Sequence, residues 1–252
     1  MHPWNLDIAN VSFHYAFSRD NALENISLRI EAGTLTGLLG RNGSGKSTLG
    51  MLIAAQAHPS HGSILVNGAT VWENAEAMAG IALVSDDTPV FKDSRTEETL
   101  KLWAASRPQW DDDWAHTLLD AFGISTRKKP KNMSRGQKSA LFASLGLAAR
   151  TPITIFDEVH LGMDAVAREI FYRALLKDFT AHPRTILISS HLIEEIESLL
   201  DHVILLDHGH VIEAGDADDV RARHTKEGDV PSLTDVLMDL TMNDAQRQLI
   251  GQ

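Results

Sequence analysis

The feature that most constrains this chain is a glycine-rich segment, GLLGRNGSGKSTLGMLI, which runs from Gly37 to Ile53. It fits the spacing G-x-x-x-x-G-K-[ST], with a strand-like apolar stretch before it and helical apolar spacing after it. Glycines let backbone amides turn inward as an anion nest, and the following helix directs its positive dipole end to the same point. The segment therefore predicts a polyphosphate site. A structural glycine turn is the alternative, and the order of strand, loop and helix argues against it.

The residues of this loop have distinct expected roles. Lys46 is expected to reach the β and γ phosphates as a point charge, and the Ser47 hydroxyl to be a ligand of the Mg²⁺ ion that bridges them. Backbone amides and small side chains complete the nest. The residues predicted to form the site are Gly40, Asn42, Gly43, Ser44, Gly45, Lys46, Ser47 and Thr48.

Length and composition exclude several classes of protein. A chain of 252 residues with 43% hydrophobic residues predicts one large domain or one domain with an inserted lobe. The formal net charge of -11 argues against a sequence-independent nucleic-acid binder, which needs a basic surface. The absence of cysteine excludes disulfides, thiolate zinc sites and cysteine nucleophiles. No signal peptide or membrane span is expected from the sequence.

The apolar patterns predict an α/β fold. Strands are expected at residues 5–15, 22–30, 31–40, 64–68, 81–85, 153–157, 185–190 and 202–207. The first two alternate apolar and polar residues and predict a β-rich N-terminal edge, whereas the later ones are continuous apolar runs separated by helical patterns. The best architecture is therefore a mostly parallel sheet with helices around it.

Two helical regions complete the expected organisation. Residues from about Phe91 to Arg150 show only helical patterns, which predicts an inserted helical lobe, and Trp110, Trp114 and Leu118 are spaced to share one buried helical face. Residues 216–252 are expected to form a C-terminal tail whose amphipathic helix follows a capping serine. That helix could pack on its own domain or on a partner.

A pair of acids stands at the end of an apolar strand. In ITIFDE, Asp157 and Glu158 would be costly to bury unless water, metal or a ligand reached them. Asp157 is suited to hold Mg²⁺ through a water molecule, and Glu158 to polarise the water that attacks the γ phosphate. Two solvated loop acids are the alternative interpretation. His191 follows the strand TILISS at a comparable edge, where a site histidine is favoured over a surface or core one.

Together these residues resemble the nucleotide-binding domain of the ATP-binding cassette (ABC) family, over nearly the whole chain to about residue 215. The most specific motif is MSRGQ, Met133 to Gln137, which is similar to the family signature LSGGQ. The resemblance implies a P-loop NTPase core, residues 1–215, with a mostly parallel sheet, an N-terminal antiparallel β edge and an inserted α-helical lobe at about residues 91–150. It implies ATP and Mg²⁺ as ligands. Two such domains face head to tail in the family, so Ser134, Gly136 and Gln137 of one subunit would close on ATP held by Lys46 of the other.

Other positions carry over from the family one by one. Tyr15 matches the aromatic residue that stacks on adenine, although Phe13 or Phe17 could take that role and Tyr15 could instead pack in the core. His191 matches the histidine that contacts the γ phosphate. The segment LGMD, Leu161 to Asp164, matches the loop that ties the two sites of the dimer together.

Three positions near the expected site depart from the family pattern. Asp86 stands where a glutamine usually touches the metal, and we expect it to bind Mg²⁺ more directly. Arg135 replaces one of the two glycines of the signature, and its cation could meet phosphate or a neighbouring acid. Val159 and His160 replace the common Pro-Thr after the acid pair, which leaves the local loop geometry open. None of these departures removes Glu158, so hydrolysis is expected.

The resemblance implies an ATPase subunit that drives a transporter through separate membrane-spanning subunits. It would act as a homodimer, or as a heterodimer with another ABC ATPase subunit, at the cytoplasmic face of the cell membrane. An exporter is favoured over an importer by the segment PSLTDVLMDLT and by the lobe. The alternatives are a soluble ABC ATPase that acts on the ribosome or DNA, and a binding-only regulatory cassette. The acidic charge argues against nucleic acid as a partner, and Glu158 with His191 argues against loss of turnover.

Overall fold

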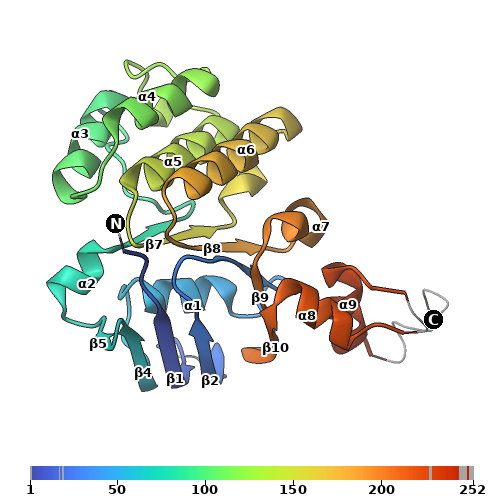
Figure 1. Cartoon of the computed structure of the whole chain (residues 1–252). Coiled ribbons are helices and arrows are strands. Elements are labelled where there is room, and N and C mark those ends of the chain that lie inside the picture. The colour runs from blue at the N-terminus through green and yellow to red at the C-terminus, as the bar shows by residue number, and fades with distance from the viewer. Residues whose placement is uncertain (1, 17, 19, 227–228, 244–248, 250–252) are drawn as a thin grey trace.

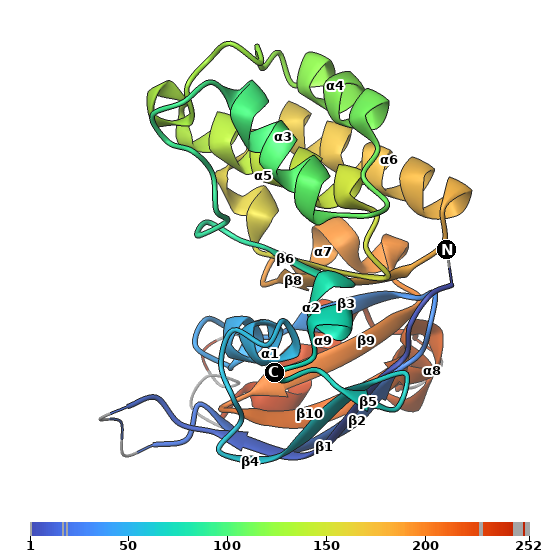
Figure 2. The ribbon, with the colours of Figure 1, turned by 90° about the vertical axis from the view of Figure 1, so that its left-hand side faces the viewer.

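The computed structural model of the chain describes residues 2–16, 18, 20–226, 229–243 and 249. Among these residues the strands form two sheets. The helices α3 to α6 lie on one side of the larger sheet, and the smaller sheet, which holds the N-terminal strands, lies on the other side (Figures 1 and 2). The smaller sheet has the order β2-β1-β4-β5. Its strands are β1 (Leu6–Phe13), β2 (Leu23–Ile30), β4 (His61–Val66) and β5 (Ala69–Thr70). All of its pairs are antiparallel, as the alternating N-terminal pattern predicts.

The larger sheet has six strands in the order β10-β9-β3-β8-β7-β6. They are β3 (Leu35–Leu39), β6 (Ile81–Val84), β7 (Ile153–Asp157), β8 (Thr185–Ser190), β9 (His202–Asp207) and β10 (His210–Asp216). Every pair is parallel except β9 with β10. Strands β3 and β8 are buried along their whole length, as expected of a parallel sheet covered on both faces. The carboxyl ends of β3, β7 and β8 therefore lie side by side at one edge.

The helix α1 (Lys46–Ile53) lies between the two sheets (Figure 2). Its residues Leu49 and Leu52 belong to one buried apolar cluster with Leu6 of the antiparallel sheet and Ile155 of the parallel sheet. This packing fixes the start of α1 at the end of β3. The short helices of the chain are α2 (Ala75–Ala79), α7 (Ile193–Ile196), and the 3₁₀ turns η1 (Pro130–Asn132), η2 (Val159–Gly162) and η3 (Glu197–Leu199).

The helical lobe consists of α3 (Thr96–Ser106), α4 (Asp112–Ala121) and α5 (Arg135–Ala149). The helix α6 (Ala165–Ala181) packs against α5, which also contacts β6 and β7 of the parallel sheet. The sequence pattern does not separate α3 from α4. The chain leaves the helix between them because Pro108 disfavours helical backbone before it and offers no N–H, and Asp111 then caps α4 by accepting from Trp114 N. Trp110 therefore lies in the turn rather than on the predicted helical face, although both tryptophans still pack against the core.

The C-terminal part forms α8 (Ala217–Arg223) and α9 (Leu233–Thr241). Ser232 and Asp235 make a capping box at α9, and Leu233, Val236 and Leu237 are buried in the main core cluster. Leu233 N also donates to Glu197 Oε2 at 2.9 Å. Of the two alternatives for this helix, the structure shows packing on its own domain. The remainder of the predicted tail, residues 227–228, 244–248 and 250–252, lies outside the described residues.

None of the helices in the described part of the chain is both long and apolar enough to cross a membrane.

Candidate active site

The glycine loop joins the end of β3 to the start of α1, and its backbone conformation depends on glycine. Gly40 has φ 155° and Gly45 has φ 110°, in the left-handed half of conformational space. A Cβ on Gly40 would lie 2.2 Å from the Leu206 carbonyl oxygen, and one on Gly45 would lie 2.6 Å from Leu23 Cδ2. Both positions exclude a side chain on grounds of space as well as backbone angle. The path of the loop backbone at these two positions is therefore one that glycine allows and other residues do not.

Lys46, the first residue of α1, is directed back into this loop. Its Nζ donates to the carbonyl oxygens of Gly40 at 2.8 Å and Arg41 at 3.1 Å, and it lies 3.5 Å from Glu158 Oε1. The residue is only 5% exposed. Burial lowers the pKa of Lys46, and the attraction of Glu158 offsets part of that effect. One positive charge is therefore fixed beside the loop, close to the acid pair.

The acid pair lies at the carboxyl end of β7, beside β8. Asp157 is paired in register with Ser189, whose Oγ donates to Asp157 Oδ1 at 2.5 Å. Glu158 has φ 51° and donates its N–H to the Ser189 carbonyl at 3.2 Å. A left-handed backbone at a glutamate is uncommon and costs energy, so the surrounding structure holds this side chain in place.

Glu158 also contacts the predicted site histidine. Its Oε1 lies 3.1 Å from His191 Nδ1. Lys46, Glu158 and His191 therefore form one cluster, although they come from α1, the end of β7 and the end of β8. A carboxylate that faces an open cavity beside a fixed cation can accept a proton from a water molecule.

The predicted metal-binding residues share that cavity. It has a volume of about 270 Å³ and is lined by Ser47, Ser85, Asp86, Asp87, Arg135, Asp157, Glu158 and Leu161. In the described parts of the chain, no set of at least three His, Asp or Glu side chains is arranged to hold a metal ion by itself. A hydroxyl and carboxylates in the lining nevertheless fit Mg²⁺, which prefers oxygen ligands and takes several of them from water and phosphate.

Two of the departures from the family pattern meet each other. Arg135 Nη2 lies 3.4 Å from Asp86 Oδ2, and the side chains are 73% and 66% exposed. The partner of Arg135 in this structure is thus a neighbouring acid, one of the two alternatives left open by the sequence. An exposed pair of this kind contributes about 0–1 kcal/mol to stability. Its importance therefore lies in placing a cation among the acids that line the cavity.

The signature residues form the start of α5. Ser134 caps the helix by accepting from Gln137 N at 3.2 Å, and Gln137 Oε1 accepts from Ser134 N at 3.3 Å in return. A Cβ on Gly136 would lie 2.9 Å from the Gly162 carbonyl, so a side chain there requires a shift. Arg135 is the signature residue that lines the cavity beside Ser47 and Glu158. Within a single chain, Ser134 and Gln137 thus serve as a helix cap.

Tyr15 lies beside the loop helix. Its hydroxyl is 2.9 Å from Thr48 Oγ1, and the residue is 47% exposed. Phe13, one of its alternatives, is buried and makes an edge-to-face contact with the Tyr15 ring at 5.0 Å. Phe17, the other alternative, lies outside the described residues. Of Tyr15 and Phe13, Tyr15 is the exposed residue and is therefore the one that a base could reach.

Several residues near the loop give no clear signal in the sequence. The hairpin between β9 and β10 reaches the loop, where Gly209 N donates to the Ser44 carbonyl at 3.0 Å. Asp207 and His208 of this hairpin line a second cavity of about 250 Å³ with Arg41, Asn42, Gly43 and Ser44. The Ser44 hydroxyl is buried without a partner among the described residues. Their proximity depends on the pairing of β9 with β3, which a local sequence pattern does not specify.

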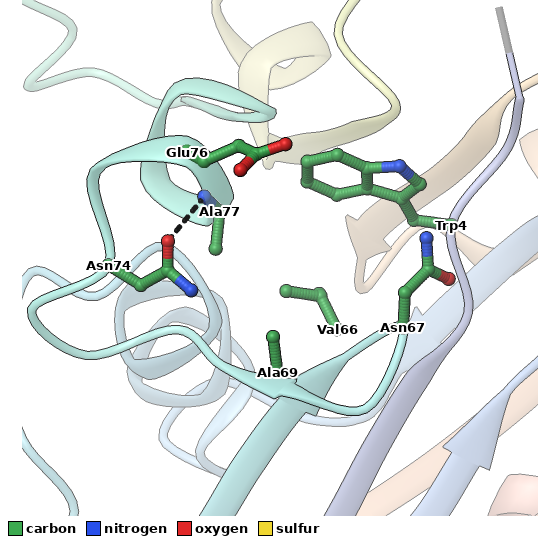
Figure 3. Close-up of a pocket in the computed structure, with 7 residues that line it drawn as sticks. All are labelled: Trp4, Val66, Asn67, Ala69, Asn74, Glu76 and Ala77. Atoms are coloured by element: carbon green, nitrogen blue, oxygen red, sulfur yellow. Dashed lines mark hydrogen bonds between the residues drawn. The ribbon is translucent and has the colours of Figure 1, made fainter.

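A further cavity, of about 210 Å³, shares no lining residue with the two described above (Figure 3). It is lined by Trp4, Val66, Asn67, Ala69, Asn74, Glu76 and Ala77. Asn74 Oδ1 is already occupied as the cap of α2, accepting from Ala77 N at 3.1 Å. The lining carries a carboxylate and no basic side chain, so this cavity does not suit a polyphosphate.

Comparison with known proteins decides the family. The family model described as ABC transporter matches residues 23–160. The chain belongs to the ABC transporter family. It is similar to the ABC transporter ATP-binding protein YtrB of Bacillus subtilis (strain 168), with 28% identity over 211 residues, covering 84% of this chain and 72% of YtrB.

The other similarities concern a longer protein and a solved structure. The chain is 28% identical over 231 residues, 87% of its length, to an ATP-dependent lipid A-core flippase of Pseudomonas fluorescens (strain Pf0-1), of which it spans only 38%. A solved structure of an ATP binding subunit of an ABC transporter superposes with a TM-score of 0.82 at 24% identity, covering 94% of this chain and 99% of that one. These comparisons confirm the predicted family and the α/β fold class. They also confirm the prediction that the chain is an ABC transporter ATPase.

Proposed function

We propose that this chain binds Mg²⁺ and ATP on the loop from Gly40 to Ser47 and hydrolyses ATP to ADP and phosphate. It would do so as the ATPase subunit of an ABC transporter whose membrane-spanning subunits are separate chains. The observation that carries the proposal is the convergence of Lys46, Glu158 and His191 beside the glycine loop. A fixed cation, a carboxylate base and a second polar group at one point are what phosphoryl transfer to water requires.

Each residue has a role that its position supports. Lys46 would exchange its carbonyl partners for the β and γ phosphates. Glu158 would accept a proton from the attacking water as the new P–O bond forms and the bond to ADP breaks, with the His191 ring placed to contact the γ phosphate. Ser47 and Asp157, with Asp86 beside them, would hold Mg²⁺, which supplies charge neutralisation at the phosphate oxygens. Tyr15 would stack on the adenine ring.

The signature residues are proposed to act on a second subunit. Ser134 is exposed at the N-terminus of α5, and a second copy or a related subunit could bring its Ser134, Gly136 and helix dipole against the γ phosphate. ATP would then hold the dimer closed, and hydrolysis would release it. The free energy available to move a membrane partner is the difference in ATP affinity between closed and open dimers. We propose that the chain works at the cytoplasmic face of the membrane.

Replacing the loop lysine tests the nucleotide site. Lys46→Ala is expected to weaken ATP binding by roughly ten- to a hundredfold, because a buried charge-assisted contact with phosphate is lost. Lys101→Ala is the matched control, since Lys101 is an exposed lysine on α3. Binding measured by calorimetry and phosphate release should fall together in the Lys46 variant only. Equal affinity for ATP in both variants would place the nucleotide elsewhere.

Magnesium dependence tests the role proposed for Asp86. In Asp86→Gln, the Mg²⁺ concentration that gives half-maximal phosphate release is expected to rise by about tenfold, because a carboxylate near the metal is lost. Asp87→Asn is the control, because Asp87 lines the same cavity as the next residue along the chain. An unchanged Mg²⁺ dependence in Asp86→Gln, or an equal rise in the Asp87 control, would remove Asp86 from the metal site.

A further inference from the structure

A buried histidine, His160, lies close in the chain to Glu158, which forms the proposed catalytic pair with His191. His160 belongs to the 3₁₀ turn η2 that follows Glu158, and no part of it is exposed. Its Nε2 lies 3.0 Å from Ser190 Oγ, and its Nδ1 has no hydrogen-bond partner among the described residues. Burial lowers the pKa of His160 to about 4, so the ring is neutral at neutral pH. The hydrogen bond to Ser190 is therefore the polar contact that orients this ring.

Ser190 in turn holds the backbone around His191. Its Oγ accepts the N–H of Leu192 at 2.9 Å, which spans the two peptide units on either side of His191. Ser190 is fully buried as the last residue of β8. One hydroxyl thus contacts both the His160 ring and the backbone next to His191.

Covalent links and hydrogen bonds join His160, Ser190, His191 and Glu158 into one closed circuit. His160 is joined to Glu158 through the chain by Val159, to Ser190 by a hydrogen bond, and Ser190 is joined to His191 by a peptide bond. The circuit closes where His191 Nδ1 meets Glu158 Oε1 at 3.1 Å. Glu158 and His191 are therefore both linked to the buried His160. Glu158 is linked through Val159, and His191 is linked through Ser190.

Packing alone does not account for an imidazole at this position. A buried polar group with an unpartnered nitrogen costs free energy that an apolar side chain of similar volume would avoid. The neighbouring ring of Tyr172 lies 6.0 Å away between centroids, and its hydroxyl donates to Glu195 instead of to His160. Among the described residues, the one hydrogen bond of the His160 side chain is thus directed at the segment that carries His191.

We propose that His160 is a positioning residue, whose hydrogen bond to the Ser190 hydroxyl fixes the turn at residues 190–192 and thereby holds His191 against Glu158. The proposal rests on the proposed function, since it assigns a role within the same hydrolytic site. The residue acts through Ser190 and touches no reacting atom. Its loss should lower the rate of the chemical step and leave ATP affinity unchanged.

The test is a set of variants of the full chain, assayed for kcat and KM with Mg²⁺ and ATP. His160→Leu and Ser190→Ala are each expected to lower kcat by roughly three- to tenfold at unchanged KM, the effect of losing one orienting hydrogen bond. The double variant should lose no more than either single variant, because both remove the same bond. His160→Gln should restore most of kcat, since its amide can donate or accept and so reproduces the bond in either ring tautomer.

Two controls separate positioning from general destabilisation. Tyr172→Phe removes the hydroxyl contact beside His160 but keeps the bond to Ser190, so kcat should stay at the native value. Ser190→Ala deletes only one oxygen and remains informative if His160→Leu folds poorly. The proposal is overturned if kcat is native in Ser190→Ala, if the losses multiply in the double variant, or if Gln gives no rescue. Absence of turnover in the unmodified chain would instead overturn the proposed function, and the positioning role with it.

Discussion

Glu158→Gln is expected to lower the rate of phosphate release by at least about 100-fold, because the amide cannot accept the proton of the attacking water. The substitution keeps the shape of the side chain and its place at the end of β7, beside Lys46 and His191. ATP affinity should therefore stay near the native value. The combination of retained binding and lost turnover distinguishes a base from a residue that merely contributes to the fold.

The same variant should change the oligomeric state with ATP. Because bound ATP is no longer consumed, size-exclusion chromatography with light scattering should show a stable dimer in ATP and Mg²⁺, and a monomer without nucleotide. Glu169→Gln is the control, since Glu169 is an exposed acid on α6 that pairs with Arg173. Native turnover in Glu158→Gln would show that another group takes the proton.

Asp178→Leu is expected to destabilise the chain by about 3–5 kcal/mol, because it leaves a buried arginine without its counter-charge. Arg184 is fully buried, and its Nη2 lies 2.7 Å from Asp178 Oδ2. Arg150 also reaches Asp178 at 3.1 Å and continues to Asp111 at 2.7 Å. Because Asp111 caps α4 of the lobe and Asp178 lies on α6, this ion-pair cluster joins the lobe to the rest of the domain.

Urea denaturation with two further variants checks this account. In the double variant Asp178→Leu with Arg184→Met both buried charges are replaced by apolar groups, and most of the lost stability should return. Arg173→Ala removes an exposed pair with Glu169 and should cost at most about 1 kcal/mol. If Asp178→Leu loses no more than the Arg173 variant, or if the double variant is the least stable of the three, burial does not control the energetics of this cluster.

Local patterns predict the parts of the site that are continuous in sequence. The glycine loop combines a buried strand, glycines at close approaches and a helix, and each of these has a local signature. Asp157, Glu158 and His191 end apolar strands, and parallel neighbours place such ends at one sheet edge. The sequence therefore predicts both the strands and the edge at which the polar residues meet.

Contacts between segments that are distant in the sequence cannot be predicted from local patterns. Asp86 and Arg135 are 49 positions apart, and His160 and Ser190 are 30 positions apart, so their meeting depends on how the lobe and strands pack. For the same reason α9 has an apolar face that predicts burial without saying against which surface. The strand β10 is not predicted either, because its half-exposed residues carry a weak apolar pattern.

The most direct measurement is a crystal structure of the Glu158→Gln variant grown with ATP and Mg²⁺. The account predicts a triphosphate on the amides of the loop from Gly40 to Ser47, with Lys46 on its β and γ phosphates. It also predicts Ser134 of a second subunit against the γ phosphate. A nucleotide bound at any other place, or a nucleotide on this loop with every Ser134 turned away from it, would contradict the account.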